Sequence, residues 1–214
     1  ILQAGGNAVD AAVATAFAEA VTWPAAGNLG GGGFMLIYPG GKAEPVVIDY
    51  RETAPAASTK TMFTRKDNGY SPKSVGVPGT VAGLALAHVR FGKLPWRDVV
   101  TPAVKLAGDG FAIDEALASS LNGVVASSEH YPELRRVLGK DGGKGRWRAG
   151  DRLTQPDLAK TLRRIADDGG AGFYTGETAD LFAAEMKAAG GIITKEDLES
   201  YKAKERPPVH GVYR

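Results

Sequence analysis

The 214-residue sequence has no cysteine, only three histidines and no long uninterrupted apolar run. The absence of cysteine excludes disulfides, thiolate catalysis and cysteine-ligated metals, and it suits an oxidising compartment as well as the cytosol. The most apolar stretch, residues 7–22, is interrupted by Asp10 and Glu19 and is too short to cross a bilayer. We therefore expect no membrane span. The opening residues, ILQAGGNAVD, include no initiator methionine and no basic leader, so we expect the true N-terminus, with any signal peptide, to lie outside this chain.

The sequence also has little net charge, at +2, and its lysines and arginines are dispersed among acidic residues. A balanced charge distribution of this kind argues against nucleic acid or an anionic membrane as the main partner. The richest basic stretch, RRVLGKDGGKGRWR at residues 135–148, is interrupted by glycines. We interpret this stretch as a solvated connector and not as a binding groove.

Residues that could hold a metal or act as a nucleophile form no recognisable pattern. His88, His130 and His210 are isolated from one another, and no H-E-x-x-H spacing occurs. The sequence contains no G-x-S-x-G elbow and no G-x-x-x-x-G-K-[ST] phosphate loop. It thus predicts no metal and no organic cofactor, and it offers no nucleophile paired with a base. His88 lies in an apolar helical stretch, and we expect it to be a hydrogen-bonded core residue.

The apolar pattern predicts an N-terminal helix, then a β-hairpin, then a series of helices. Residues 7–22 have the helical pattern, with Asn7 as N-cap and Asp10 completing a capping box. The runs FMLIY and PVVID, joined by a Pro-Gly-Gly turn region, predict a hairpin of buried strands. From Ser74 onward the pattern is mostly helical.

Particular residues predict where the later helices begin and end. Pro102 predicts a break or a new start within a helical stretch, because proline lacks the amide donor that a helix interior needs. Thr154 and Asp157 have the spacing of a capping box. Thr194 and Asp197 have the same spacing at the start of a short last helix.

Four consecutive glycines, residues 30–33, stand directly before the first strand of the hairpin. Ordering four glycines costs much conformational entropy, so a close approach of the backbone to another group must require them. That group could be a ligand or a neighbouring segment of the chain. Since the glycines precede a strand and not a helix, a phosphate cradle is not expected, and the residues favour packing.

The segment DYRETAP, residues 49–55, places Arg51 at the end of the second predicted strand. A guanidinium offers five donors in a planar fork that suits a carboxylate held at two points. At the end of a strand it would be rigid and close to the mouth of a cavity. The alternative is that Arg51 pairs with Glu52, Asp49 or another structural acid, and composition alone favours this alternative.

Motifs that resemble one known family follow one another in family order along the chain. They are GGNAVDAAVATAFA, GNLGGGGFMLIY, DYRETAP, SVGVPGTVAGL, FGKLPWRDVVTPAVKLAGDGF, QPDLAKTL, GGAGFYTGETA, and EDLESY with the closing VHGVYR. Together they closely resemble the γ-glutamyltransferase (glutathione hydrolase) family from about Gly5 onward, most weakly between residues 117 and 150. R-E-T-A-P and GNLGGGGF are the most specific of them.

The resemblance implies an α+β fold of the N-terminal-nucleophile hydrolase type, an αββα sandwich of which this chain forms a mostly helical part with a β-hairpin. It implies a precursor that cuts itself into a large and a small subunit. The new N-terminal threonine of the small subunit then transfers the γ-glutamyl group of glutathione to water, an amino acid or a peptide. We expect residues 1–214 to be a single partial domain, most of the large subunit, which lacks that threonine and is inactive alone.

By the same resemblance, Arg51 clamps the α-carboxylate of the bound γ-glutamyl group, and Glu52 orients Arg51 or a neighbouring strand. No catalytic residue is expected within the chain, and the family chemistry requires no metal or cofactor. The expected partners are γ-glutamyl compounds and the small subunit, in the periplasm or outside the cell. Three alternatives stay open: a glutaryl-cephalosporin acylase, a poly-γ-glutamate transpeptidase, or a non-catalytic paralogue that retains the Arg51 site.

Overall fold

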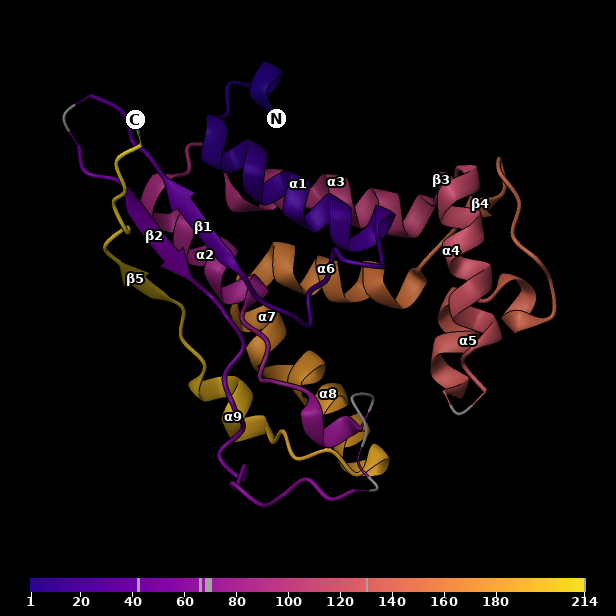
Figure 1. The fold of residues 1–214 in the computed structure, drawn as a ribbon. Coiled ribbons are helices and arrows are strands. Elements are labelled where there is room, and N and C mark those ends of the chain that lie inside the picture. Colours follow the sequence, from indigo (N-terminus) through magenta and orange to yellow (C-terminus); the bar gives the residue numbers. More distant parts are fainter. Residues whose placement is uncertain (42, 66, 68–70, 130, 214) are drawn as a thin grey trace.

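The computed structural model describes residues 1–214 except 42, 66, 68–70, 130 and 214 (Figure 1). The described chain is mostly helical, with small antiparallel sheets. Its α-helices are α1 (Ala8–Thr22), α2 (Thr80–Phe91), α3 (Trp96–Asp109), α4 (Glu115–Ala126), α5 (Pro132–Leu138), α6 (Pro156–Asp168), α7 (Ala171–Tyr174), α8 (Gly176–Ala189) and α9 (Lys195–Ser200). Its strands are β1 (Phe34–Ile37), β2 (Val46–Asp49), β3 (Phe111–Ala112), β4 (Arg152–Leu153) and β5 (Lys204–Arg206).

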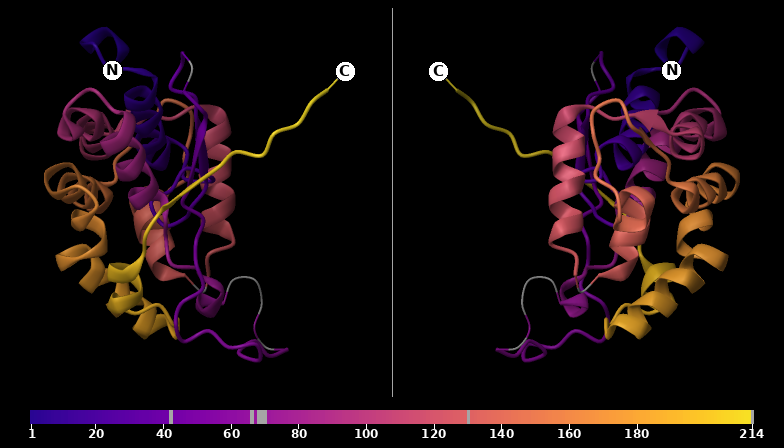
Figure 2. Two further views of the ribbon diagram at one scale, coloured as in Figure 1. Left: turned by 90° about the vertical axis from the view of Figure 1, so that its left-hand side faces the viewer. Right: turned by 90° about the vertical axis from the view of Figure 1, so that its right-hand side faces the viewer.

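The larger sheet has the strand order β1-β2-β5, and both pairings are antiparallel. The β1–β2 hairpin confirms the sequence prediction. The third strand, β5, was not predicted, because its residues KER are all exposed and show no apolar alternation. Ion pairs accompany its backbone pairing: Arg206 Nε lies 2.5 Å from Asp49 Oδ2, and Glu205 pairs with Arg90. Beyond β5 the chain leads away from the body (Figure 2).

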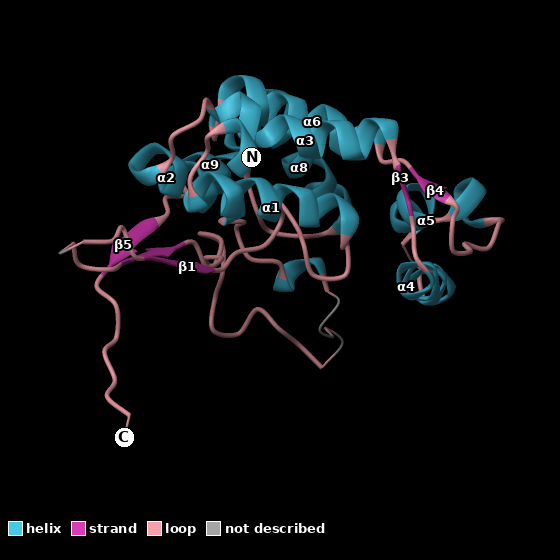
Figure 3. Cartoon of the chain, turned by 90° about the horizontal axis from the view of Figure 1, so that it is seen from above, coloured by secondary structure: helices cyan, strands magenta, loops and turns pink. Residues whose placement is uncertain are grey.

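The two faces of this sheet differ. On one face Ile37 and Ile48 are buried against α2, where Ala87 is fully buried as well. Seen from above, the strands lie on one side of the helical layer (Figure 3). On the other face Phe34, Leu36 and Tyr38 have exposed fractions of 59%, 66% and 64%. The prediction that both strands are buried is thus wrong for this face of β1, because among the described residues no helix or sheet covers it.

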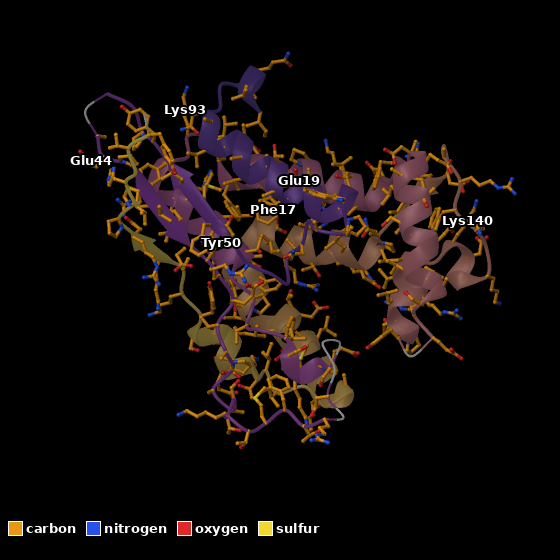
Figure 4. All side chains as sticks on the ribbon, in the orientation of Figure 1. Phe17, Glu19, Glu44, Tyr50, Lys93 and Lys140 are labelled. Carbon is orange, nitrogen blue, oxygen red and sulfur yellow. The ribbon has the colours of Figure 1, made fainter. Side chains whose placement is uncertain are left out.

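Helix α3 lies between α1 and α6 and forms the centre of the core. Val13, Phe17 and Val21, spaced four residues apart on α1, are fully buried (Phe17 is labelled in Figure 4). The predicted break at Pro102 is wrong, because α3 continues through it. A proline inside a helix costs about 3 kcal/mol. That cost is outweighed because α3 buries apolar side chains such as Val99, each worth about 1.5–3 kcal/mol when fully buried.

A second, smaller core lies beside α4 and α5, which project from the far ends of α3 and α6 (Figure 1). It contains Trp147, whose exposed fraction is 8%. The indole Nε1 donates to the carbonyl of Leu138 at 2.8 Å. Our interpretation of residues 135–148 as a solvated connector is confirmed for most of these residues, which are exposed, and is wrong for Trp147, which is buried. The segment includes the end of α5 and a 3-10 turn (Lys140–Gly143), and Trp147 anchors it.

Three of the predicted caps can be compared directly with the structure. The capping boxes of Asn7 with Asp10 and of Thr194 with Asp197 are both present. The predicted box at Thr154 is wrong, because α6 begins after Gln155 and has no side-chain cap. Gln155 instead uses its side-chain amide to donate to the carbonyl of Val21 in α1, at 2.8 Å. This hydrogen bond to α1 takes the place of the local cap.

Asp10 is fully buried and connects α1 to the loop between α2 and α3. Its carboxylate accepts hydrogen bonds from the backbone N–H groups of Asn7, Lys93 and Leu94, at 2.9–3.3 Å. His88 Nε2 lies 2.9 Å from the carbonyl oxygen of Leu94 and 3.5 Å from Asp10 Oδ1. The prediction that His88 is a hydrogen-bonded core histidine is confirmed.

Two kinds of feature are absent from the described part of the chain. No helix there combines the length and the apolarity that crossing a bilayer requires. Within the same residues, no group of three or more His, Cys, Asp or Glu side chains is placed to hold a metal ion.

Candidate functional site

Arg51 follows β2 by two residues and lies at the end of the strand, as predicted. Its side chain is 58% exposed and borders two hollows. The larger, of about 660 Å³, is lined by Gly30, by the segment from Arg51 to Pro55 and by residues between 58 and 76. The smaller, of about 200 Å³, lies toward β5 and includes Tyr201 and Arg206. A guanidinium at this junction is accessible to a small molecule in either hollow.

The guanidinium of Arg51 has one acidic partner among the described residues. Its Nη2 lies 3.3 Å from Oε2 of Glu52. That oxygen is buried, and no donor meets hydrogen-bond geometry with it in the described part of the chain. The pair is therefore a charge contact without a directed hydrogen bond. The predicted structural pairing with Glu52 exists, but it leaves the fork of Arg51 exposed.

Asp49, the other acid proposed for Arg51, is used differently. Its Oδ1 accepts from the backbone N–H of Arg51 at 3.1 Å, and its Oδ2 pairs with Arg206 of β5. The side-chain hydrogen bond from Arg206 and the backbone one from Arg51 hold the pKa of Asp49 below its usual value. Asp49 is thus a carboxylate at neutral pH that fixes the backbone at Arg51 and not its guanidinium.

The glycine run packs against the chain next to Arg51. A Cβ on Gly32 would lie 2.3 Å from the carbonyl oxygen of Tyr50, and a Cβ on Gly31 would lie 2.3 Å from the side chain of Asn28. Gly33 exchanges two backbone hydrogen bonds with Tyr50, which lies where the chain leaves β2 (Figure 4). Gly30, by contrast, would have open space around a Cβ and borders the larger hollow. Packing therefore explains Gly31 to Gly33, and Gly30 alone adjoins the space for a ligand.

The segment that starts α2 holds the same stretch from the other side. A Cβ on Gly79 would lie 2.0 Å from the carbonyl oxygen of Tyr50, and one on Gly76 would lie 2.7 Å from the Cβ of Glu52. Thr53 and Val77 form an isolated antiparallel bridge with hydrogen bonds of 3.3 and 2.8 Å. The backbone on either side of Arg51 is thus fixed by close contact with two glycine-containing segments that lie apart in the sequence.

Cations predominate around Arg51. Lys73 borders the larger hollow and pairs with Asp67 at 3.3 Å. Lys202, Lys204 and Arg206 border the smaller one, where Asp49 and Glu52 are the acids. Such a surface attracts a small anionic molecule, and a carboxylate is the group that a guanidinium fork binds at two points.

By its likeness to solved structures, the fold belongs to one class of protein, the N-terminal-nucleophile hydrolases. The chain superposes on the crystal structure of γ-glutamyltranspeptidase from Helicobacter pylori with a TM-score of 0.93 and 44% identity, over 100% of this chain and 62% of that one. The family model for gamma-glutamyltranspeptidase matches residues 1–214. The chain belongs to the γ-glutamyltranspeptidase family.

Two curated relatives share the name "Glutathione hydrolase proenzyme". The protein from Pseudomonas aeruginosa is 48% identical over 98% of this chain. The protein from Escherichia coli is 48% identical over 100% of this chain. This chain spans 37% and 38% of the lengths of these two relatives, so it corresponds to a part of each.

Proposed function

We propose that this chain is the large-subunit portion of a γ-glutamyltransferase that acts on glutathione and related γ-glutamyl amides. Arg51 binds the α-carboxylate of the donor. The observation that carries the proposal is the position of Arg51, whose backbone is fixed on both sides while its fork stays exposed at the junction of two hollows. The family membership and the name of the two curated relatives support glutathione as donor over a glutaryl-cephalosporin or poly-γ-glutamate.

The chemistry needs a nucleophile from the small subunit, the other product of the same precursor. Its threonine oxygen attacks the γ-carbonyl carbon, the amide C–N bond breaks, and the leaving amine takes the proton. Water or an acceptor amine then attacks the acyl-enzyme and releases the threonine oxygen. Arg51 takes no part in bond making. It fixes the far end of the donor so that the γ-carbonyl meets the nucleophile in one orientation.

The exposed face of β1 is the surface that we propose for the small subunit. Phe34 and Leu36 of β1, and Tyr38 directly after the strand, alternate along the chain and are all more than half exposed. Large apolar side chains gathered on one face mark a surface that another layer covers. A second sheet placed there would complete the four-layer sandwich.

We also propose that the mature protein acts in the periplasm or outside the cell, which fractionation of cells expressing the whole gene would test.

The test of the proposed function uses the complete open reading frame and the substitution Arg51→Lys, which keeps the charge and loses the fork. A charged hydrogen-bonded contact is worth about 1.5–3 kcal/mol. We therefore expect KM for a γ-glutamyl anilide to rise roughly tenfold or more, with self-cleavage intact. For a matched donor without the α-carboxylate, KM should change little. Arg97→Lys, at an exposed pair with Asp167 outside the two hollows, is the control.

Two results would contradict the proposal. If self-cleavage failed while KM in the matured fraction stayed at the wild-type value, Arg51 would be structural. If both donors lost affinity equally, Arg51 would bind some other part of the substrate. A wild-type protein that released no glutamate from glutathione would exclude the activity itself.

A further inference from the structure

Helix α9 and the residue after it contact residues 51–56 at two points. Oδ1 of Asp197 accepts from the backbone N–H of Ala56 at 2.8 Å. The hydroxyl of Tyr201, the residue directly after α9, donates to the carbonyl of Arg51 at 2.8 Å. The two contacts join residues that are 141 and 150 positions apart in the sequence. Figure 1 shows the chain that leaves β2 running beside α9.

We propose that Asp197 and Tyr201 are positioning residues that set where the guanidinium of Arg51 lies, and so govern selectivity for donors with an α-carboxylate. This inference rests on the proposed function. Tyr201 holds the R-E-T-A-P segment at its first residue, Arg51, and Asp197 holds it just beyond its last residue, at Ala56. Because Tyr201 binds the backbone carbonyl of Arg51, a shift of that carbonyl would also move the guanidinium.

Asp197 is suited to this role because its carboxylate is buried and fully used. Its exposed fraction is 9%. While Oδ1 binds Ala56, Oδ2 accepts from the backbone N–H and the hydroxyl of Thr194, at 2.9 and 3.1 Å. The carboxylate of Asp197 thus completes the capping box of α9 and also binds the loop at Ala56. The position of this loop is therefore fixed relative to the start of α9.

Tyr201 is held in place by its own neighbours. Its ring stacks on Tyr174 with centroids 5.8 Å apart and planes 8° from parallel. Tyr174 is itself fixed, because its hydroxyl donates to the carbonyl of Pro78 at 2.9 Å and accepts from Ala82 N–H at 3.2 Å. A Cβ on Gly79 would lie 2.2 Å from the Tyr201 oxygen, so a glycine is needed there.

The pKa of the Tyr201 hydroxyl favours its role as a hydrogen-bond donor. Burial raises its pKa to about 12, and the nearby carboxylates of Asp49 and Glu52 act in the same direction. The hydroxyl is therefore protonated at neutral pH and keeps its hydrogen for the carbonyl of Arg51. An interaction of this kind acts mainly on binding of the γ-glutamyl donor and less on the attack at its γ-carbonyl, so KM should change more than kcat.

The test again uses the complete protein, with Tyr201→Phe and Asp197→Asn. The readout is the donor-selectivity ratio, which is kcat/KM for a γ-glutamyl anilide divided by kcat/KM for the matched donor without the α-carboxylate. We expect each substitution to lower this ratio roughly threefold, the effect of one hydrogen bond, through KM of the carboxylate donor. Thr101→Val removes a comparable hydroxyl-to-carbonyl bond, 2.6 Å to Arg97 within α3 and outside both hollows, and should leave the ratio unchanged.

A double-substitution cycle separates positioning from general destabilisation. If Tyr201 acts through Arg51, Tyr201→Phe should have almost no further effect on the ratio in the Arg51→Lys background. The inference would be overturned if Tyr201→Phe lowered thermal stability but left the ratio at the wild-type value. It would also be overturned if the effects of Tyr201→Phe and Arg51→Lys on the ratio were fully additive. In both cases the role of Arg51 would stand. If Arg51→Lys itself leaves the ratio unchanged, the proposed function fails and the inference falls with it. Should Asp197→Asn not fold, Tyr201→Phe decides alone.

Discussion

Asp10 and Asp197 occupy the same capping-box position in two helices but hold different loops. Each is the third residue of a capping box, at the start of α1 and of α9. Each is buried and accepts a backbone N–H from a loop far along the chain. Asp10 holds the loop at Lys93, which borders neither of the Arg51 hollows, whereas Asp197 holds the loop that contains Arg51. By our proposal, the same capping box supports the core at Asp10 and the candidate site at Asp197, depending on the loop that the carboxylate binds.

The largest effect is expected for Asp10→Asn. The amide has one acceptor oxygen, and in either orientation its NH2 group faces backbone donors: the N–H of Lys93 if it replaces Oδ1, or the N–H groups of Asn7, Lys93 and Leu94 if it replaces Oδ2. A buried donor without a partner costs about 1–3 kcal/mol. We expect about 3 kcal/mol less free energy of unfolding, measured by urea denaturation of the mature protein. The donor-selectivity ratio should stay at the wild-type value, and a changed ratio would contradict the division between the two aspartates.

A smaller loss of stability is expected for Asp197→Asn, because fewer backbone donors depend on this carboxylate. We expect about 2 kcal/mol, from the bond to Ala56 and part of the cap. Unlike Asp10→Asn, it should also lower the selectivity ratio. Urea denaturation and donor kinetics on one preparation would check the stability and the selectivity ratio. If only the stability fell, Asp197 would have the same purely structural role as Asp10.

Thr194→Ala sharpens the comparison, because it removes the cap of α9 and keeps the bond between Asp197 and Ala56. Loss of an N-cap threonine costs about 1 kcal/mol. We expect a loss of that size in the free energy of unfolding, with at most a slight change in the selectivity ratio. If Thr194→Ala lowered the ratio as much as Asp197→Asn, the helix as a whole, and not its contact with Ala56, would control Arg51.

The smallest effect is a change in pH dependence. Burial raises the pKa of Asp10, but the hydrogen bonds from Asn7, Lys93 and Leu94 outweigh it, so the pKa lies below 3.8. The pKa of Asp197 is lowered in the same way by Ala56 and Thr194. A carboxyl with a lower pKa in the folded state stabilises the fold above the unfolded value, and this stability is lost as pH falls through the folded pKa. Unfolding followed from pH 7 to pH 3 should show a shallower acid decline in either asparagine variant, and unchanged curves would contradict the assigned pKa values.

The features that the sequence predicted well depend on neighbouring residues. The capping boxes at Asn7 and Thr194, the hairpin, and the position of Arg51 after a strand each follow from a few consecutive side chains. Local hydrogen-bond chemistry and apolar alternation determine such features in almost any surroundings.

The features that sequence reasoning missed depend on distant partners. Strand β5 has no apolar pattern and forms by pairing with β2. Pro102 remains inside α3 because the packing of α1 and α6 outweighs its cost, and Gln155 replaces a cap because α1 supplies an acceptor. The contacts of Asp197 and Tyr201 with the Arg51 segment could not be found from spacing, although EDLESY had marked both residues.

The most direct test of the account is a crystal structure of the complete, mature protein with L-glutamate bound. We predict that the guanidinium of Arg51 holds the α-carboxylate by two parallel hydrogen bonds, with its carbonyl still bonded to the hydroxyl of Tyr201. A structure in which Arg51 turns to Glu52 and the ligand lies elsewhere would contradict the account.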